Sequence, residues 1–164
     1  PAGGYVAMCL RAGPKFMLVF DSPNWKEEKA GRMLEGDASD VVKAALKEVG
    51  LKPSDGYYTS LVKSAKPKDQ KALTNGQISS CTKWLDREIE ILKPPIIIAM
   101  GSNTVRHFTK GMKGTAADLA SKIIYDKGLD ASIVLGLNPG MIFHDPSKIT
   151  LVEKVFAAVG ELLS

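Results

Sequence analysis

The sequence has 164 residues, of which 45% are hydrophobic and 24% are charged, and this fits one compact domain that can bury an ordinary core. We therefore predict a single domain over residues 1–164. The formal net charge of +4 suits a polyanionic partner but is also common in proteins without one. The two cysteines, Cys9 and Cys81, cannot form a four-cysteine zinc or iron–sulfur site, so we predict no metal and no cofactor.

The sequence has no apolar run near the roughly 20 residues that a membrane helix needs, and its N-terminus has no basic region followed by an apolar segment. We expect a cytoplasmic protein with no membrane partner. The chain begins at Pro1 rather than at a methionine, which fits removal of the initiator or excision from a longer polypeptide. Both origins stay open.

The first half of the chain alternates between apolar runs and helical spacing. Residues 16–20 (FMLVF) form a continuous apolar run, which is typical of a strand covered on both faces. A polar loop follows over residues 21–36, and residues 37–50 have the apolar spacing of an amphipathic helix that ends at a glycine. Residues 57–62 are rich in β-formers and predict a strand, and residues 63–71 predict a basic loop.

The second half repeats this alternation. Apolar residues recur every three or four positions from Asn75, a good N-cap residue, until two prolines stop the pattern after Leu92. The remaining predicted elements are a strand at 96–100, a helix through Phe108, a short helix at 116–120, a candidate strand at 122–125, a core strand at 133–137 and a helix at 145–163.

Strands that alternate with helices, with central strands that are apolar throughout, predict an α/β fold. We expect three layers, α/β/α, around a central, mainly parallel sheet of four strands. In such sheets, ligands bind in a crevice beyond the carboxyl ends of the strands. The crevice is therefore expected among the loops that begin at Phe20, Lys63, Gly101 and Asn138.

Short motifs follow these strands at characteristic spacing. They are Phe20-Asp21-Ser22-Pro23-Asn24, Gly31-Arg32-Met33-Leu34, the run 57–64, Cys81 with the run 88–101, and Asn138-Pro139-Gly140 before Met141-Ile142-Phe143. From about Lys15 to Leu163, their order and spacing resemble family 4 of the uracil-DNA glycosylase superfamily. The resemblance implies that family's fold, but it also shows changes at the positions that carry the family's chemistry.

The resemblance implies two catalytic positions. Hydrolysis of a glycosidic bond requires a flipped nucleotide, a group that positions water and donors that steady the departing base. Asp21 stands where the family has a glutamate that orients the water, and it keeps the carboxylate on a shorter side chain. Asn138 stands where the family has a histidine that steadies the leaving base, and it can donate a hydrogen bond but cannot carry charge.

The resemblance also implies substrate-binding positions, at Phe20, Ser22, Leu34, Ser60 and Asn138. Phe20 replaces a glycine where backbone approaches the ligand, so its ring is expected to fill part of the pocket. Leu34 replaces a stacking phenylalanine, and Ser60 replaces an asparagine that reads the uracil edge. Together these changes predict weak uracil excision.

The iron–sulfur cluster of the family is not expected here. Cys81 matches one ligand position, and the other three have no counterpart. The residues expected to contact DNA are Lys63, Lys66 and Lys68 in the basic loop, Ser102 after the third strand, and Met141 and Ile142 at the place of the family's duplex-probing wedge.

Each of these assignments has an alternative. Asp21 can cap a helix or a turn instead of positioning water, and Asn138 is turn-forming by composition. The lysines can simply solvate a loop, and the apolar residues after Gly140 can pack onto the last helix.

Three functions stay open on the sequence. The first is a glycosylase-like domain that binds DNA or a nucleotide in replication or repair without efficient uracil excision, as part of a larger polypeptide such as a DNA polymerase subunit. The second is an active DNA glycosylase for another damaged base, in which Asp21 positions water. The third is a protein-interaction module of a DNA polymerase assembly.

Overall fold

The structure is a computed structural model that describes residues 8–9 and 13–164. Its strands are β1 (Met8–Cys9), β2 (Phe16–Phe20), β3 (Gly56–Ser60), β4 (Ile96–Met100), β5 (Ile123–Asp126) and β6 (Ala131–Gly136). Its α-helices are α1 (Trp25–Ala30), α2 (Asp37–Glu48), α3 (Asn75–Leu92), α4 (Ser102–Thr109), α5 (Ala116–Leu119) and α6 (Ile149–Leu163). Short 3-10 helices are η1 (Pro53–Asp55), η2 (Pro139–Phe143) and η3 (Pro146–Lys148).

Within the described residues the strands form one sheet in the order β1-β3-β2-β4-β6-β5. The four central strands, β3, β2, β4 and β6, are mutually parallel, as the sequence predicts. The two outer strands, β1 and β5, pair antiparallel with β3 and β6, so the sheet is wider than the four strands predicted. The register pairs Phe20 with Ser60 and with Met100, and Met100 with Gly136, so the parallel strands end together at one edge.

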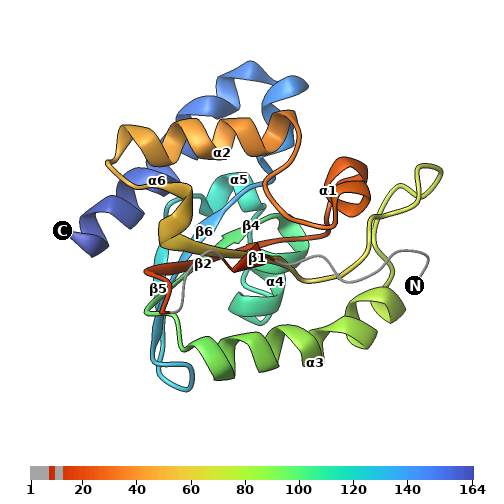
Figure 1. Cartoon of the computed structure of the whole chain (residues 1–164), viewed down its shortest axis with the longest axis horizontal. Helices are drawn as coiled ribbons and strands as arrows, with labels where there is room; N and C mark the ends of the chain where they lie inside the picture. The colour runs from red at the N-terminus through yellow and green to blue at the C-terminus, as the bar shows by residue number, and fades with distance from the viewer. Residues whose placement is uncertain (1–7, 10–12) are drawn as a thin grey trace.

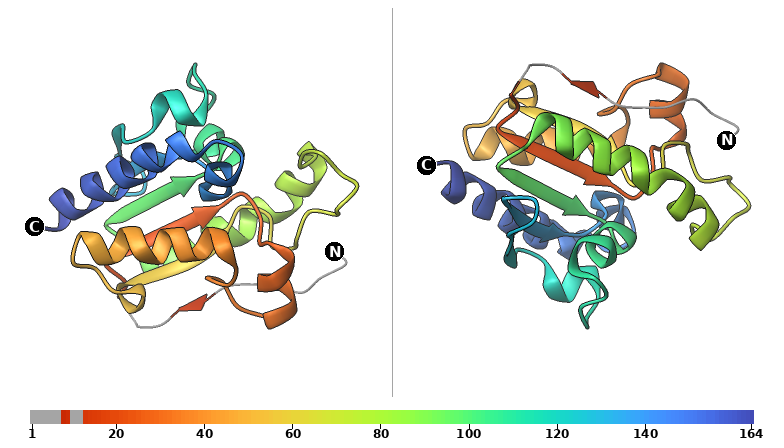
Figure 2. Two further views of the ribbon diagram at one scale, coloured as in Figure 1. Left: turned by 90° about the horizontal axis from the view of Figure 1, so that it is seen from above. Right: turned by 90° about the horizontal axis from the view of Figure 1, so that it is seen from below.

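The sheet lies between helices, which confirms the predicted three-layer α/β/α architecture. Helices α2 and α6 cover one face, and α3 and α4 lie on the opposite face (Figure 1). Figure 2 shows the molecule from above and from below the view of Figure 1. Helices α2 and α6 lie in front of the strands in the first of these views, and α3 lies in front of them in the second. Every residue of β2, β3 and β4 is buried, which explains why β2 and β4 are apolar runs without alternation.

The main departure from the sequence prediction is helix α1, which lies inside the segment 21–36 that was expected to be a loop. Its start is a capping box: the Asn24 side chain accepts from the Glu27 backbone N–H, and the Glu27 side chain accepts from the Asn24 backbone N–H. Gly31, with a φ of 72°, ends the helix in the left-handed conformation. Because α1 has only six residues, it is too short to show helical periodicity.

The last helix also begins later than expected. Asp145 caps the 3-10 turn η3, and α6 itself starts at Ile149. Over residues 8–9 and 13–164, none of the helices combines the length and the apolar character that crossing a membrane would require.

Candidate functional site

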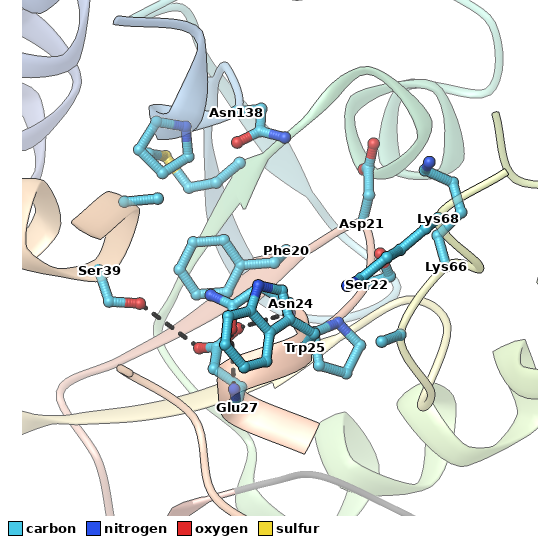
Figure 3. A pocket seen from close by; sticks show the side chains of 15 residues that line it. Phe20, Asp21, Ser22, Asn24, Trp25, Glu27, Ser39, Lys66, Lys68 and Asn138 are labelled. Atoms are coloured by element: carbon cyan, nitrogen blue, oxygen red, sulfur yellow. Dashed lines mark hydrogen bonds between the residues drawn. The ribbon is translucent and has the colours of Figure 1, made fainter. Parts of the chain in front are cut away.

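A cavity of about 280 Å³ lies at the carboxyl ends of the central strands, where the sequence predicts the crevice (Figure 3). Of the residues predicted to form the site, it is lined by Phe20, Asp21, Ser22, Lys66, Lys68 and Asn138. Leu34, Ser60, Lys63, Ser102, Met141 and Ile142 do not line it. Asn24, Trp25, Glu27 and Ser39 line it without having been predicted. The structure therefore brings together half of the predicted residues and adds a group from α1 and α2.

Asp21, directly after β2, is held by the N-terminus of α4. Its Oδ1 accepts from the Thr104 backbone N–H at 2.8 Å and from the Thr104 hydroxyl at 2.7 Å. Its Oδ2 accepts from the Asn103 backbone N–H at 3.3 Å and from the Asn103 side-chain amide at 3.1 Å. The N-cap residue of α4 is Gly101, which has no side chain to cap the helix. Asp21 therefore supplies the cap from the loop that directly follows β2.

The contact between Asp21 and α4 requires a glycine at position 101. Its φ is 153°, and a Cβ atom at this position would lie 2.4 Å from Asp21 Oδ1. Only a glycine therefore allows the carboxylate to approach the first turn of α4 this closely. Asp21 and Gly101 form one local arrangement at the edge of the sheet.

Asn138, directly after β6, opens the turn η2. Its Oδ1 accepts from the Gly140 backbone N–H at 2.9 Å. Its amide nitrogen donates no hydrogen bond within the part of the chain that the structure describes, and the side chain is exposed on the crevice wall (Figure 3). Asn138 is thus a turn residue that still offers an N–H group to the crevice.

Of the residues expected to contact the substrate, Phe20 lines the cavity, whereas Leu34 and Ser60 do not. The ring of Phe20 lies in the crevice lining and is only 8% exposed. Leu34 is buried, and its backbone N–H donates to Glu27 Oε2 at 2.8 Å. Ser60 is fully buried and its hydroxyl donates to the Val62 carbonyl at 2.6 Å. Leu34 and Ser60 are therefore buried within the fold, and of these three residues only Phe20 lines the cavity.

Lys63 is a correction to the expected DNA contacts, because it is buried at 3% exposure. Its Nζ donates to the Thr59 hydroxyl and to the Ser60 carbonyl, each at 2.6 Å, and it pairs with the Glu88 carboxylate of α3. Burial lowers the pKa of Lys63, and Glu88 opposes this shift. An ammonium group held in this way joins β3 to α3 and does not face a phosphate.

Lys66 and Lys68 stay near the crevice because their loop is tied to α1. The Ala65 backbone N–H donates to Glu28 Oε2 at 2.6 Å, and the Lys66 ammonium donates to the Gln70 carbonyl. Lys68 is exposed, and its Nζ lies 5.8 Å from the centroid of the Trp25 ring. Of the three loop lysines predicted to contact DNA, one is thus buried and two lie at the crevice.

The remaining predicted DNA contacts lie outside the cavity. Ser102 is the exposed first residue of α4. In η2, Met141 is exposed, whereas Ile142 is half-buried and packs against the core. Their contact with DNA stays a prediction.

Glu27 is the acidic residue of the crevice that the sequence reasoning missed. It is 3% exposed, and besides its capping bond it accepts at Oε2 from Leu34 N–H and, at 3.4 Å, from the Ser39 hydroxyl. Burial raises the pKa of Glu27, and hydrogen bonds to Asn24 and Leu34 oppose the shift. The capping-box spacing of Asn24 and Glu27 was the available signal for it.

The described residues do not provide a ligand set for the iron–sulfur cluster of family 4. Cys81 lies half-buried on α3, and the described residues contain no group of three or more His, Cys, Asp or Glu side chains that could hold a metal ion. An iron–sulfur cluster takes four cysteine ligands, and the whole sequence has two cysteines. The residues of this chain therefore do not fit the cluster.

The model of the uracil DNA glycosylase superfamily matches residues 10–160. The chain belongs to the uracil DNA glycosylase superfamily. Its resemblance to family 4 is supported by the type-4 uracil-DNA glycosylase of Sulfurisphaera tokodaii, which is 24% identical over 90% of this chain and 70% of that protein.

Two further relatives are polymerases. The DNA polymerase III subunit alpha of Yersinia pestis is 27% identical over 92% of this chain and 13% of that subunit. The DNA polymerase of Bacillus phage SP01 is 32% identical over 58% of this chain and 10% of that polymerase. The chain therefore spans a small part of the polymerases that it matches and most of the Sulfurisphaera glycosylase.

Proposed function

We propose that this superfamily member is a DNA-binding domain of replication or repair that does not excise uracil efficiently. The observation that carries the proposal is the state of Asp21. Its two carboxylate oxygens accept four hydrogen bonds, all from Asn103 and Thr104. A carboxylate has about four lone-pair sites for hydrogen bonds. Because Asp21 has all of them in use, it has no free site with which to orient a water molecule.

The other positions of the crevice support the same proposal. Phe20 reduces the space for a base, and Asn138 offers a neutral donor where a charged group would steady a leaving anion best. Ser60 is fully buried and donates to a backbone carbonyl, so it does not present an edge-reading group to a base. Uracil would therefore find neither a water-positioning base nor paired hydrogen bonds.

DNA binding is supported by the rim of the crevice, where Lys66, Lys68 and exposed Trp25 come together. Cations that contact phosphates dominate the affinity of proteins for DNA. The match to part of two DNA polymerases is consistent with a role inside a larger replication polypeptide. Both the DNA partner and the larger polypeptide are part of this proposal.

A second candidate is a glycosylase that acts on another damaged base. The amide N–H of Asn138 favours it, because this donor faces the crevice and has no hydrogen-bond acceptor among the described residues. It could contact an oxygen or a ring nitrogen of a base that the narrowed pocket admits. Asp21 would then have to leave α4 to position water.

Excision assays separate the two candidates. The chain and its Asp21→Ala variant are incubated with oligonucleotides that contain uracil, hypoxanthine or an alkylated base, and strand cleavage at abasic sites is measured. We expect no turnover above the uncatalysed rate on any of them, and a stability loss of about 1 kcal/mol for Asp21→Ala from the lost helix cap. Turnover that Asp21→Ala abolishes would overturn the proposal and establish the second candidate.

DNA binding is tested on the same preparations. The affinity of the chain for a labelled oligonucleotide should fall linearly with the logarithm of the salt concentration. Asp21→Ala should not weaken that affinity, since the substitution removes a negative charge from the crevice lining and no cation. An affinity that does not respond to salt would argue for the protein-interaction module instead.

A further inference from the structure

We propose that Trp25 is a stacking platform for a base of single-stranded DNA, at the rim of the crevice rather than inside it. The inference rests on the proposed function and deepens it by naming the strandedness of the partner and the side chain that holds a base. Trp25 is the first residue of α1 and lies on the crevice lining (Figure 3). Its side chain is 57% exposed, although a large aromatic ring is usually placed where it can be buried.

Hydrogen bonds hold the backbone on both sides of Trp25. Asn24, immediately before it, forms the capping box with Glu27, and the Asn24 amide also donates to the Glu35 carbonyl at 2.9 Å. Glu28 holds the backbone of the basic loop through Ala65. Trp25 is therefore fixed on both sides along the chain while its ring stays open to solvent, which is the arrangement of a preorganised contact.

Two cations lie near this ring. The Nζ atoms of Lys26 and Lys68 each lie 5.8 Å from its centroid, and Lys66 lines the same cavity. Cation–π attraction at exposed sites is weak, so these ammonium groups can move to phosphates when a strand arrives. An aromatic ring among lysines is the combination by which proteins bind single strands: the ring stacks a base, and the cations follow the backbone.

The rim offers an open stacking face that the interior of the cavity does not. Inside, the ring of Phe20 lies in the lining of the cavity. A base stacked outside on the exposed ring of Trp25 needs none of the space within the cavity. In a duplex, both faces of each base are already stacked, so the platform selects single strands.

The chain provides a matched control for this platform. Trp84 on α3 is the second tryptophan of the sequence, is 37% exposed, and has Lys83 Nζ 5.1 Å from its ring centroid. It is therefore also a tryptophan beside a lysine, but it does not line the crevice. Trp25 and Trp84 differ in location more than in chemistry.

The test measures the affinity of the chain and of three variants for a labelled oligothymidylate about 12 nucleotides long, over a series of salt concentrations. Trp25→Ala should weaken binding roughly tenfold or more with an unchanged salt slope, because a stacked base is lost and no phosphate contact. Trp25→Phe should retain most of the affinity. Trp84→Ala should bind as the unchanged chain does.

A second readout uses Trp25 itself. In the Trp84→Phe variant, Trp25 is the only tryptophan left, and its fluorescence should be quenched by the single strand and much less by the matching duplex. If Trp25→Ala binds like the unchanged chain, or if Trp84→Ala loses as much affinity as Trp25→Ala does, Trp25 is not a stacking platform. The proposed DNA binding would not be affected by either result. If the unchanged chain binds neither strand nor duplex, the proposed function itself fails.

Discussion

Two groups of side chains in and around the crevice differ in how many partners they have. Asp21, Glu27 and Lys63 each make several hydrogen bonds within the fold, and we refer to them as the anchored residues. Around the rim of the crevice, Trp25 and Lys68 are exposed, and these are the rim residues. The ionisable groups that chemistry would need are thus occupied in holding the fold, whereas the groups that binding would need are open.

The difference can be tested, because the two sets should respond oppositely to substitution. Changes to anchored residues should lower the free energy of unfolding and leave DNA affinity alone. Changes to rim residues should do the reverse. An anchored residue that altered binding without altering stability would break the comparison.

The largest loss of stability is expected for Lys63→Ala. It leaves the Glu88 carboxylate, whose side chain is only 15% exposed, without its cation. Breaking a buried ion pair costs about 3 to 5 kcal/mol, and we expect about 3 kcal/mol because Thr59 and Tyr57 still donate to Glu88. Urea unfolding followed by circular dichroism measures the change.

The control for this loss is a double-mutant cycle with Glu88→Ala. If the two side chains act as a pair, the double variant should be clearly more stable than the sum of the single losses predicts. Strict additivity would mean that Lys63 stabilises the fold through its packing and its hydrogen bonds to Thr59 and Ser60, without a contribution from the pair with Glu88.

The next largest effect is expected for Gly101→Ala, at about 2 kcal/mol or more. The new Cβ would lie 2.4 Å from Asp21 Oδ1, and the φ of 153° is strained for any side chain. Gly111→Ala is a matched control, since its φ is 87° but nothing lies within 4 Å of the added Cβ. The difference between the two unfolding free energies therefore measures the contact with Asp21, and equal losses would contradict it.

Much of the fold could be predicted from the sequence because the central strands are buried on both faces. Runs such as residues 16–20 and 96–100 are apolar throughout, and two prolines mark the end of the helix at Leu92. Strand β1 and helix α1 could not be predicted in this way. The first has two residues and the second six, so neither is long enough to establish a period.

The site could be predicted only in part, because strand ends locate a crevice but do not say which side chains reach it. Asp21 and Asn138 were assigned from the resemblance to family 4, and both line the crevice because they directly follow β2 and β6. Lys63 follows β3 in the same way, yet its side chain turns inward to a partner on α3, which is 25 residues away in the sequence. Such a partner is set by tertiary packing and leaves no local signal.

A smaller effect is expected from the titration of Glu27. Burial raises its pKa above the ordinary value of 4.5, so the folded chain holds this proton more tightly than the unfolded chain. Its contribution to stability is fully present below pH 4.5 and is lost as the pH rises through the folded pKa. Urea unfolding at a series of pH values should show this decline for the unchanged chain and not for Glu27→Gln. Parallel pH profiles would show that Glu27 does not titrate in this way.

The smallest change in stability, and the sharpest contrast with Lys63, is expected for Lys68→Gln. Lys68 is exposed and lies five positions after Lys63 in the same loop, so its neutralisation should alter the free energy of unfolding by less than about 0.5 kcal/mol. The salt dependence of binding to a single strand should nevertheless become shallower by about 0.7 for each phosphate contact removed. Lys110→Gln removes an exposed lysine from the end of α4, which does not line the crevice, and should leave that slope unchanged. Equal slopes for the two variants would mean that the rim attracts DNA only through the net charge of the chain, and the distinction between rim and anchored lysines would then concern folding alone.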